Sequence, residues 1–288
     1  MTRSSASHRL WASLLLIPAL AIVVSPRALG QSPQQIVEKV VRNEIYADDH
    51  DHSRWMYKDA YKSPDKNVVK LVIQTANGNL SQLIEDSGRP PTPQEHQADL
   101  NRIQQMLSDP SFRQKQKRNE QHDDQQARDL MNMLPKAFIW QFTGRENGEI
   151  HLSYKPNPSF SPPTMSARVL AAMSGTMVVD EHQLRLKTLN GRLTQAVEFG
   201  WGLLGRMNPG GTFQIIRTEL SSGVWDITQT HVHISGHALF FKSIGDQEDE
   251  ICSDYRPVPQ GVDLAKAAQM LRDGQVAHEL HAEVHFNH

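Results

Sequence analysis

Residues 137–242 alternate turn signals with short apolar runs, and this pattern constrains the fold more than any other stretch. Asn-Gly pairs tolerate the positive φ of tight hairpin turns, so each marks the end of a strand. The expected turns are Asn147-Gly148, Asp180-Glu181, Asn190-Gly191, residues 209–211, Ser222-Gly223 and Gly236. Between turns the side chains alternate, which is the period of two of a half-buried strand. The stretch therefore predicts one long antiparallel meander.

The sequence that follows the first thirty residues predicts a short helix and three strands. Residues 32–42 carry apolar side chains at helical spacing, whereas 43–52 are polar and acidic and predict a loop. Strands are expected at 55–62, 67–74 and 80–85, the second being rich in β-branched residues. A run of prolines at 88–93 ends this part of the chain.

A long, charged helical excursion is expected at about 93–134. Thr92 and Glu95 form a capping box at its start, and Asp109-Pro110 interrupts it. Residues 113–128 hold almost no apolar side chains, which favours a solvated helix; an arm that binds a partner is the alternative. After the meander, a helix is expected from 261 and a histidine-rich tail ends at 288.

The first thirty residues have the pattern of a secretory signal. A basic start (Arg3, Arg9) precedes an apolar run at 10–24, and Ala28-Leu29-Gly30 supplies the small residues of a cleavage site. The predicted organisation is a signal peptide at 1–30, one domain at 31–260 and a C-terminal region at 261–288. This indicates a periplasmic or secreted protein of the bacterial envelope with no transmembrane segment after cleavage; an uncleaved anchor is the alternative.

Charge and cysteine content narrow the classes of function. The net charge is −2; loss of the three arginines in residues 1–30 leaves 27 basic and 32 acidic groups, or −5. This balance does not favour nucleic acid binding. Cys252 is the only cysteine, so no intrachain disulfide forms, and its acidic neighbours predict a raised pKa. No nucleophile elbow or phosphate loop is present, so neither catalysis nor a cofactor is expected.

Several segments are similar to the secreted bacterial proteins related to outer-membrane lipoprotein-sorting proteins, the LolA/LolB-type periplasmic carriers. The resemblance runs from Trp55 to about Tyr255 and is carried by residues 142–145, 154–158, 173–180, 197–202, 210–213, 223–225 and 239–242. It implies a mainly β protein with helices (α+β): a strongly curved antiparallel half-barrel whose covering helices enclose an apolar cavity. In those carriers the cavity holds acyl chains.

The resemblance and the strand pattern together suggest an apolar ligand site. The expected lining is Trp140, Phe142, Val197, Phe199 and Trp201. The alternative for these side chains is that they fill the core, which is the commoner position of an aromatic stripe. The expected partner is a lipid or an acylated protein.

Histidines on one expected strand offer a different chemistry. His231 and His233 lie at i and i+2, so both rings point to one face, and His237 follows after Gly236. Two such ligands and a carboxylate can hold zinc or iron; a polar, solvent-facing hairpin is the alternative. In the tail, His278-Glu279 does not complete a zinc-protease motif because Ala282 replaces the second histidine.

Three functions follow from the sequence. The first is a periplasmic binding module for an apolar or acyl-bearing ligand, without catalysis. The second is a metal-dependent envelope enzyme that uses His231 and His233. The third is an interaction or regulatory protein that works through residues 113–128 and has no small ligand.

Overall fold

The computed structural model describes residues 31–199, 205–238 and 245–273. The expected signal segment, Trp201 and most of the histidine-rich tail lie outside the described residues. The elements, in chain order, are α1 (Pro33–His50), β1 (Trp55–Ser63), β2 (Lys66–Thr75), β3 (Gly78–Asp86), α2 (Pro93–Ser108), α3 (Pro110–Ala137), β4 (Phe138–Glu146), β5 (Glu149–Pro156), α4 (Met165–Ala171), β6 (Met173–Asp180), β7 (Leu186–Leu193), β8 (Val197–Phe199), β9 (Gly205–Met207), β10 (Thr212–Ser221), β11 (Val224–Ala238) and β12 (Gly245–Pro257). Residues 264–273 are also helical.

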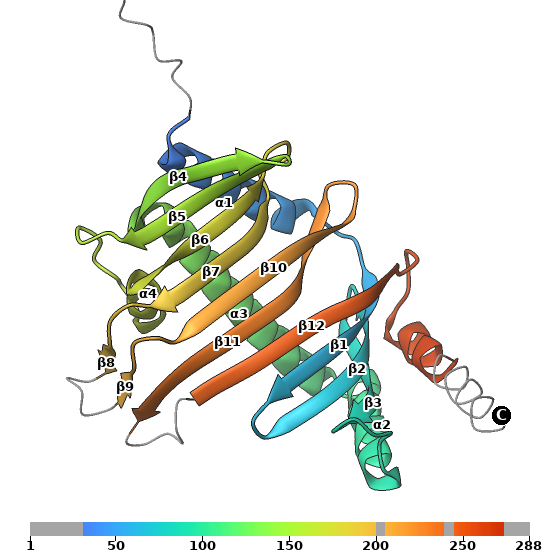
Figure 1. The fold of residues 1–288 in the computed structure, drawn as a ribbon. Helices are drawn as coiled ribbons and strands as arrows, with labels where there is room; N and C mark the ends of the chain where they lie inside the picture. Colours follow the sequence, from blue (N-terminus) through green and yellow to red (C-terminus); the bar gives the residue numbers. More distant parts are fainter. Residues whose placement is uncertain (1–30, 200–204, 239–244, 274–288) are drawn as a thin grey trace, which may run out of the picture. The chain divides into compact units, whose positions relative to one another are not determined.

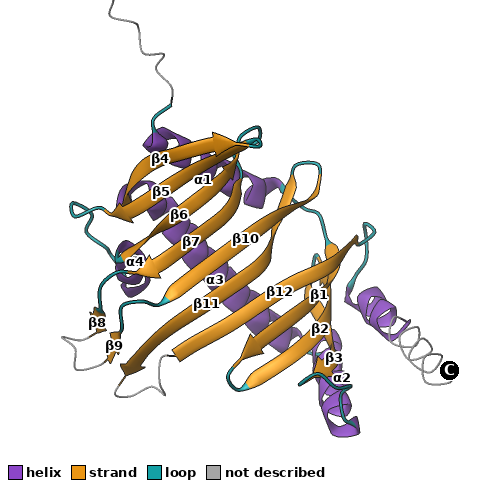
Figure 2. Ribbon diagram, in the orientation of Figure 1, coloured by secondary structure: helices purple, strands orange, loops and turns teal. Residues whose placement is uncertain are grey.

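One antiparallel sheet dominates the fold, with strand order β3-β2-β1-β12-β11-β10-β7-β6-β5-β4 (Figures 1 and 2). The short strand β8 pairs with β9, which pairs with the end of β11. The ends of this order, β3 and β4, leave the sheet open. The prediction of a mainly antiparallel α+β fold is therefore confirmed, as is the meander from β4 to β11.

Strand β12 joins the two halves of the sheet and is absent from the expected elements. It pairs with β1 on one side and β11 on the other, so it attaches the N-terminal strands to the meander. Its sequence, GDQEDEICSDYRP, is acidic and poor in the residues that favour strands. Pairing on both edges, rather than local propensity, makes this segment a strand.

Two apolar clusters form the core. The first lies between α1, the C-terminal end of α3 and the strands of the meander; Phe138, Leu152 and Met177 are almost fully buried there. The second packs α2 and residues 264–273 against β2 and β3, around Ile73 and Leu80. The middle of the sheet therefore lies between two separately packed ends.

Helix α3 bridges these clusters on the face of the sheet that also carries α1 (Figure 1). Phe112 near its start packs against the second cluster, and Leu134 near its end belongs to the first. Between them, residues 114–127 are all exposed, which agrees with a solvated helix. Arg128 fastens α3 to α1 through ion pairs with Asp48 and Asp49. We call residues 113–131 of α3 the bridge.

Several local predictions are wrong. Helix α1 continues to His50, where a loop was expected from residue 43. Asn190-Gly191 and Gly236 lie inside β7 and β11 rather than in turns. Side chains alternate from Leu193 to Trp201, which predicts a strand there, but the strand ends at Leu193 and β8 begins only at Val197. In contrast, the Thr92–Glu95 capping box and the break at Asp109 are confirmed.

Candidate functional site

A cavity of about 560 Å³ lies beneath the bridge. One stripe of α3 forms its roof, at a spacing of three or four residues per step: Arg113, Gln116, Lys117, Glu120, Asp124, Ala127, Arg128 and Met131. Such spacing places side chains along one helix face. Helix α1, strand β1, the turn between β2 and β3, and the β10–β11 hairpin form the other walls.

Apolar and charged side chains share these walls. Trp55 and Trp225 are buried aromatic residues on the sheet side, and Met106 lines the cavity near the β2–β3 turn. Charged residues of both signs lie between them, including Arg54, Asp51 and Asp226. The cavity therefore suits a ligand that has both apolar and polar parts.

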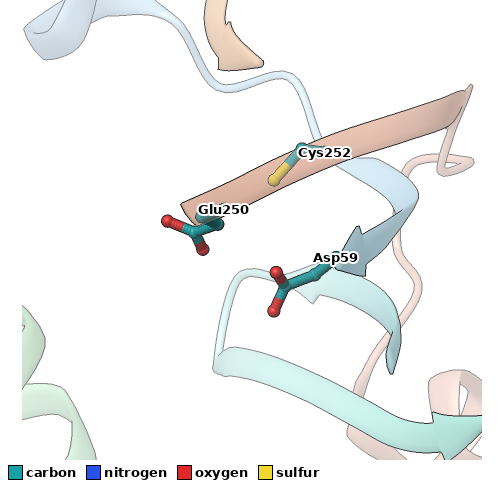
Figure 3. A group of neighbouring side chains, drawn as sticks. All are labelled: Asp59, Glu250 and Cys252. Carbon is teal, nitrogen blue, oxygen red and sulfur yellow. The ribbon is translucent and has the colours of Figure 1, made fainter. Parts of the chain in front are cut away.

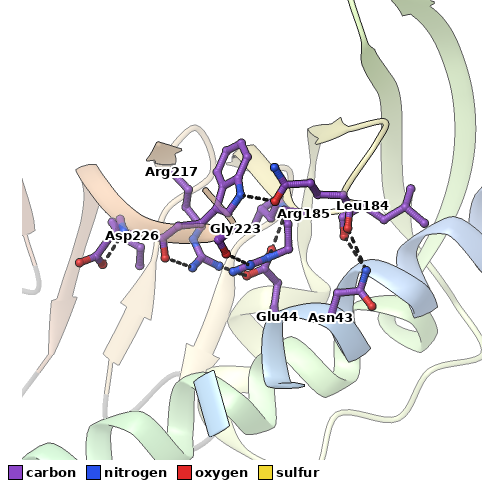
Figure 4. A network of polar contacts seen from close by, with 11 residues as sticks. Asn43, Glu44, Leu184, Arg185, Arg217, Gly223 and Asp226 are labelled. Atoms are coloured by element: carbon purple, nitrogen blue, oxygen red, sulfur yellow. Dashed lines mark hydrogen bonds and ion pairs between the residues drawn. The ribbon is translucent and has the colours of Figure 1, made fainter. Parts of the chain in front are cut away.

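A buried triad of charges, Glu44, Arg185 and Arg217, lines one end of the cavity (Figure 4). Arg185 donates from Nε to Glu44 Oε1 (3.0 Å) and from Nη2 to Oε2 (2.9 Å), a bidentate pair. Arg217 Nη1 also donates to Oε2. The backbone N–H of Leu186 donates to Oε1 at 2.7 Å. Glu44 and Arg185 are only 3% and 6% exposed.

Three local features of the chain bring the triad together. Glu44 continues the buried stripe of α1 that contains Val37, Val40 and Val41, so the helix turns its carboxylate inward. Arg185 follows Leu184, whose φ of +50° bends the chain between β6 and β7. Asn43 of α1 donates to the carbonyls of Gln183 and Leu184 and so holds this bend against the helix.

The third member, Arg217, lies at an irregularity of β10. The register of β10 against β11 shifts between Ile216 and Arg217, as in a β-bulge. Bulges redirect side chains, and Arg217 reaches Glu44 on α1 as well as the carbonyl of Trp225 (2.9 Å). Neighbouring Asp226 is half-buried, and burial raises the pKa of its carboxyl, although the Ile227 N–H and Arg217 act against this shift.

A second group, Asp59, Glu250 and Cys252, lies on β1 and β12 (Figure 3). Among the described residues it is the one set of three metal-ligating side chains whose donor atoms all lie within 4.8 Å of one another. Burial and the neighbouring carboxylates raise the pKa of the Cys252 thiol to about 12. Burial likewise raises the pKa of Asp59, and burial together with Asp59 raises that of Glu250. The predicted direction for Cys252 is confirmed, and the thiol is protonated at neutral pH, so it is no ready nucleophile.

The two predicted metal-binding histidines share a single carboxylate. Asp249 Oδ1 lies 2.6 Å from His231 Nδ1 and 3.2 Å from His233 Nε2. The hydrogen bond with His231, followed by that with His233, lowers the pKa of Asp249. Asp249 is the carboxylate beside both histidines, but the donor atoms of His231, His233 and Asp249 do not all lie within 4.8 Å of one another. The side chain of His237 lies outside the described residues.

His231 and Asp249 also belong to a polar row that crosses the sheet. Thr176, Asn190, Gln214, His231 and Asp249 stand directly opposite one another on β6, β7, β10, β11 and β12. Asn190 donates to Thr176 Oγ1 (3.2 Å), and Gln214 donates to Asn190 Oδ1 (2.8 Å). Cross-strand pairs of this kind stabilise a sheet. A shallow hollow of about 510 Å³ lies along the row. The contacts of this row are those expected of the polar-hairpin alternative.

Three of the side chains expected to line an apolar site are described, and they lie outside the cavity beneath the bridge. Trp140 and Val197 are buried in the first apolar cluster, and Trp140 donates from Nε1 to the carbonyl of Leu134 (3.1 Å). Phe142 is 46% exposed on β4. The side chain of Phe199 and all of Trp201 lie outside the described residues. The cavity beneath the bridge is lined by other residues.

The sequence analysis missed the triad. Glu44 carried a usable signal, because it continues the apolar stripe of α1 at helical spacing. Nothing local marks Arg185 or Arg217 as its partners, since they lie 141 and 173 positions further along the chain.

Among the described residues, no helix combines the length and apolar character needed to cross a membrane. Comparison of the chain with family models, curated proteins and solved structures finds no match.

Proposed function

We propose that this chain is a binding module that holds an elongated amphiphilic ligand, such as an acyl-bearing molecule, between the bridge and the sheet. The observation that carries the proposal is the cavity of about 560 Å³ beneath α3, which has charged groups along its roof and at the triad and two tryptophans, Trp55 and Trp225, on the sheet side. Pockets for small ligands commonly measure about 300–1,000 Å³.

The shape of the site favours an extended ligand. The roof residues run from Arg113 to Met131; at 1.5 Å per residue this stripe is about 27 Å long. A volume of this size spread along such a stripe makes a narrow trench rather than a round pocket. An acyl chain or a molecule of similar outline fits a trench.

The architecture also offers a route of entry. Residues 114–127 of the bridge are exposed, and the helix is held mainly at its two ends by the apolar clusters. A segment with few buried apolar contacts opens at low free-energy cost. The bridge can therefore open by local unfolding of its exposed stretch while both ends stay packed.

The sequence resemblance agrees with this role. A LolA-like half-barrel with helices over its inner face would hold its ligand in the same layer between helix and sheet. The proposed site of action is the periplasm or the cell exterior, to which the N-terminal signal pattern would direct the chain. The partner would be a lipid or an acylated protein.

Tryptophan fluorescence tests the proposal directly, because Trp55 and Trp225 line the cavity whereas Trp140 does not. Titration with lauric acid should change the emission of the wild-type protein. Trp55→Phe and Trp225→Phe should each reduce the change, and Trp140→Phe should leave it intact. Native mass spectrometry should also detect a co-purified acyl ligand. A folded protein that carries no lipid and does not respond to acyl probes would refute the proposal.

A further inference from the structure

The charges of the triad do not balance. Two guanidinium groups, of Arg185 and Arg217, meet the single carboxylate of Glu44. That carboxylate is saturated: Oε1 accepts two hydrogen bonds and Oε2 accepts two, from Arg185, Arg217 and the N–H of Leu186. Within the triad, positive charges outnumber negative charges by one; outside it, Glu219 interacts with Arg185 and Asp226 interacts with Arg217.

The one guanidinium nitrogen of the two arginines that has no partner among the described residues belongs to Arg217. Arg185 uses Nε and Nη2 on Glu44 and donates from Nη1 to the carbonyl of Gly223 (3.1 Å). Arg217 uses Nη1 on Glu44 and Nη2 on the carbonyl of Trp225. Its Nε is buried and has no hydrogen-bond partner among the described residues. Buried N–H groups almost always have partners, and an unpaired one is costly.

The other arginines of the cavity are already engaged. Arg128 is paired with Asp48 and Asp49, and Arg113 donates to the carbonyls of Met106 and Leu107. Asp226, on the neighbouring strand β11, is an acidic group whose charge interacts with that of Arg217; burial raises the pKa of Asp226, and Arg217 acts against this shift. Arg217 therefore combines partial burial with a nitrogen that has no hydrogen-bond partner among the described residues.

We infer that the ligand carries an acidic head group, a carboxylate or a phosphate, and that Arg217 binds it at the triad end of the cavity. This inference rests on the proposed function, because it gives the chemistry of one end of the same ligand. The head group would pair with the guanidinium of Arg217, and a hydrogen bond from the unpaired Nε–H would require this side chain to turn that buried donor toward the cavity. Charge-assisted hydrogen bonds to guanidinium are strong and selective for such anions. The apolar part of the ligand would then extend along the trench toward Trp55 and Met106.

A matched series of ligands separates this inference from the proposed function. Lauric acid, lauryl phosphate and lauryl alcohol share one chain and differ in the head group. At neutral pH, calorimetric titration of the wild-type protein should give affinities for one or both acids that exceed the affinity for the alcohol by about tenfold or more. The acid whose affinity exceeds that of the alcohol by the larger factor identifies the head group.

Variants assign the preference to Arg217. Arg217→Gln should bind all three ligands with the affinity of the alcohol, and it should fold because Arg185 still neutralises Glu44. Arg217→Lys keeps the charge without the Nε–H and should keep only part of the preference, which provides a second test if the first variant is unstable. Arg145→Gln, on β4 and outside the lining of the cavity, is the control and should leave the preference unchanged.

The outcomes are distinct. Equal affinities for acids and alcohol in the wild-type protein, or a preference that survives in Arg217→Gln, would overturn the inference and leave the binding function standing. A protein that binds none of the three ligands would overturn both.

Discussion

Arg185 Nη2 lies 2.9 Å from Glu44 Oε2, and this contact ties α1 to the bend between β6 and β7 across 141 positions of sequence. Both side chains are nearly inaccessible to solvent. Removing one partner of a buried ion pair leaves the other charge in a poorly solvated site, which costs more than the pair itself contributes. The position of α1, and with it one wall of the cavity, depends on this contact.

Glu44→Gln should therefore destabilise the fold by about 3–5 kcal/mol, because two buried arginines lose their common counter-ion. Urea denaturation of the purified protein measures the free energy of unfolding. Asp49→Asn is the matched control on the same helix, since it removes an exposed ion pair with Arg128 and should have little effect. Equal stability of Glu44→Gln and Asp49→Asn would contradict this account of α1.

Gly191→Ala should destabilise the sheet by about 1–3 kcal/mol through overpacking. A Cβ at this position would lie 2.0 Å from Cε1 of Phe213, which stands opposite on β10. Gly144→Ala on β4 is the control, because a Cβ there meets nothing within 4 Å. Phe213→Leu should relieve part of the cost in the double variant, and strictly additive effects would show that the ring is not the obstacle.

The same glycine shows why some turn predictions succeed and others fail. Asn147-Gly148 forms the expected hairpin turn, with φ of +52° and +75°. Asn190-Gly191 has the same residue pair but lies within β7, where the glycine makes room for an aromatic ring on the next strand. The sequence shows that a position is glycine. It does not show whether the backbone conformation or a neighbouring side chain from another strand requires the glycine.

Predictions from local sequence hold for β1, β2, β3 and most strands of the meander; β2 and β3 supply apolar side chains that the sheet buries, such as Ile73 and Leu80. They failed for β12 and for the second half of α1. Both segments are acidic, and both are held by partners far along the chain: β12 by β1 and β11, and Glu44 by Arg185 and Arg217. A polar segment is exposed to solvent only when no opposite charge or strand edge from a distant part of the chain binds its polar groups.

Cys252 should react slowly with iodoacetamide in the native protein. Its pKa is raised to about 12 by burial and by Glu250 and Asp59, so the reactive thiolate is scarce near neutral pH. Relative to the urea-unfolded chain, the rate should fall by a factor on the order of 10² to 10³. Glu250→Gln should speed the native reaction. A native rate equal to the unfolded rate would show that the thiol is neither buried nor repelled.

Limited trypsin digestion should cut the bridge before any other part of the domain. Lys115, Lys117 and Arg118 lie in its exposed stretch, which has few apolar contacts and should open locally at low cost. Lys136, near the buried end of α3, should be cut later because Leu134 and Ala137 beside it are packed in the core. Strong hydrogen-exchange protection across 114–127 would contradict this prediction, and slower cutting with lauric acid bound would agree with closure of the bridge over a ligand.

The carboxyl of Asp226 should make the protein less stable as the pH rises through its titration. Burial is the main cause that raises its pKa above the ordinary value of 3.8, so the folded state holds the proton more tightly than the unfolded chain does. Stability then falls as the pH rises from about 3.8 through the folded-state pKa, because the unfolded chain releases the proton first.

Asp226→Asn should remove this loss: the variant should be more stable than the wild type at neutral pH, and the difference should shrink below pH 3.8.

Asp254→Asn should behave in the opposite sense. Its hydrogen bond and ion pair with Lys58 lower the pKa of Asp254, so its small contribution exists above the ordinary pKa and is lost as the pH falls. Asparagine also tolerates the φ of +57° at this position. Urea denaturation across a pH series measures both variants, and wild-type and Asp226→Asn curves that run parallel would rule out the buried carboxyl as the source of the slope.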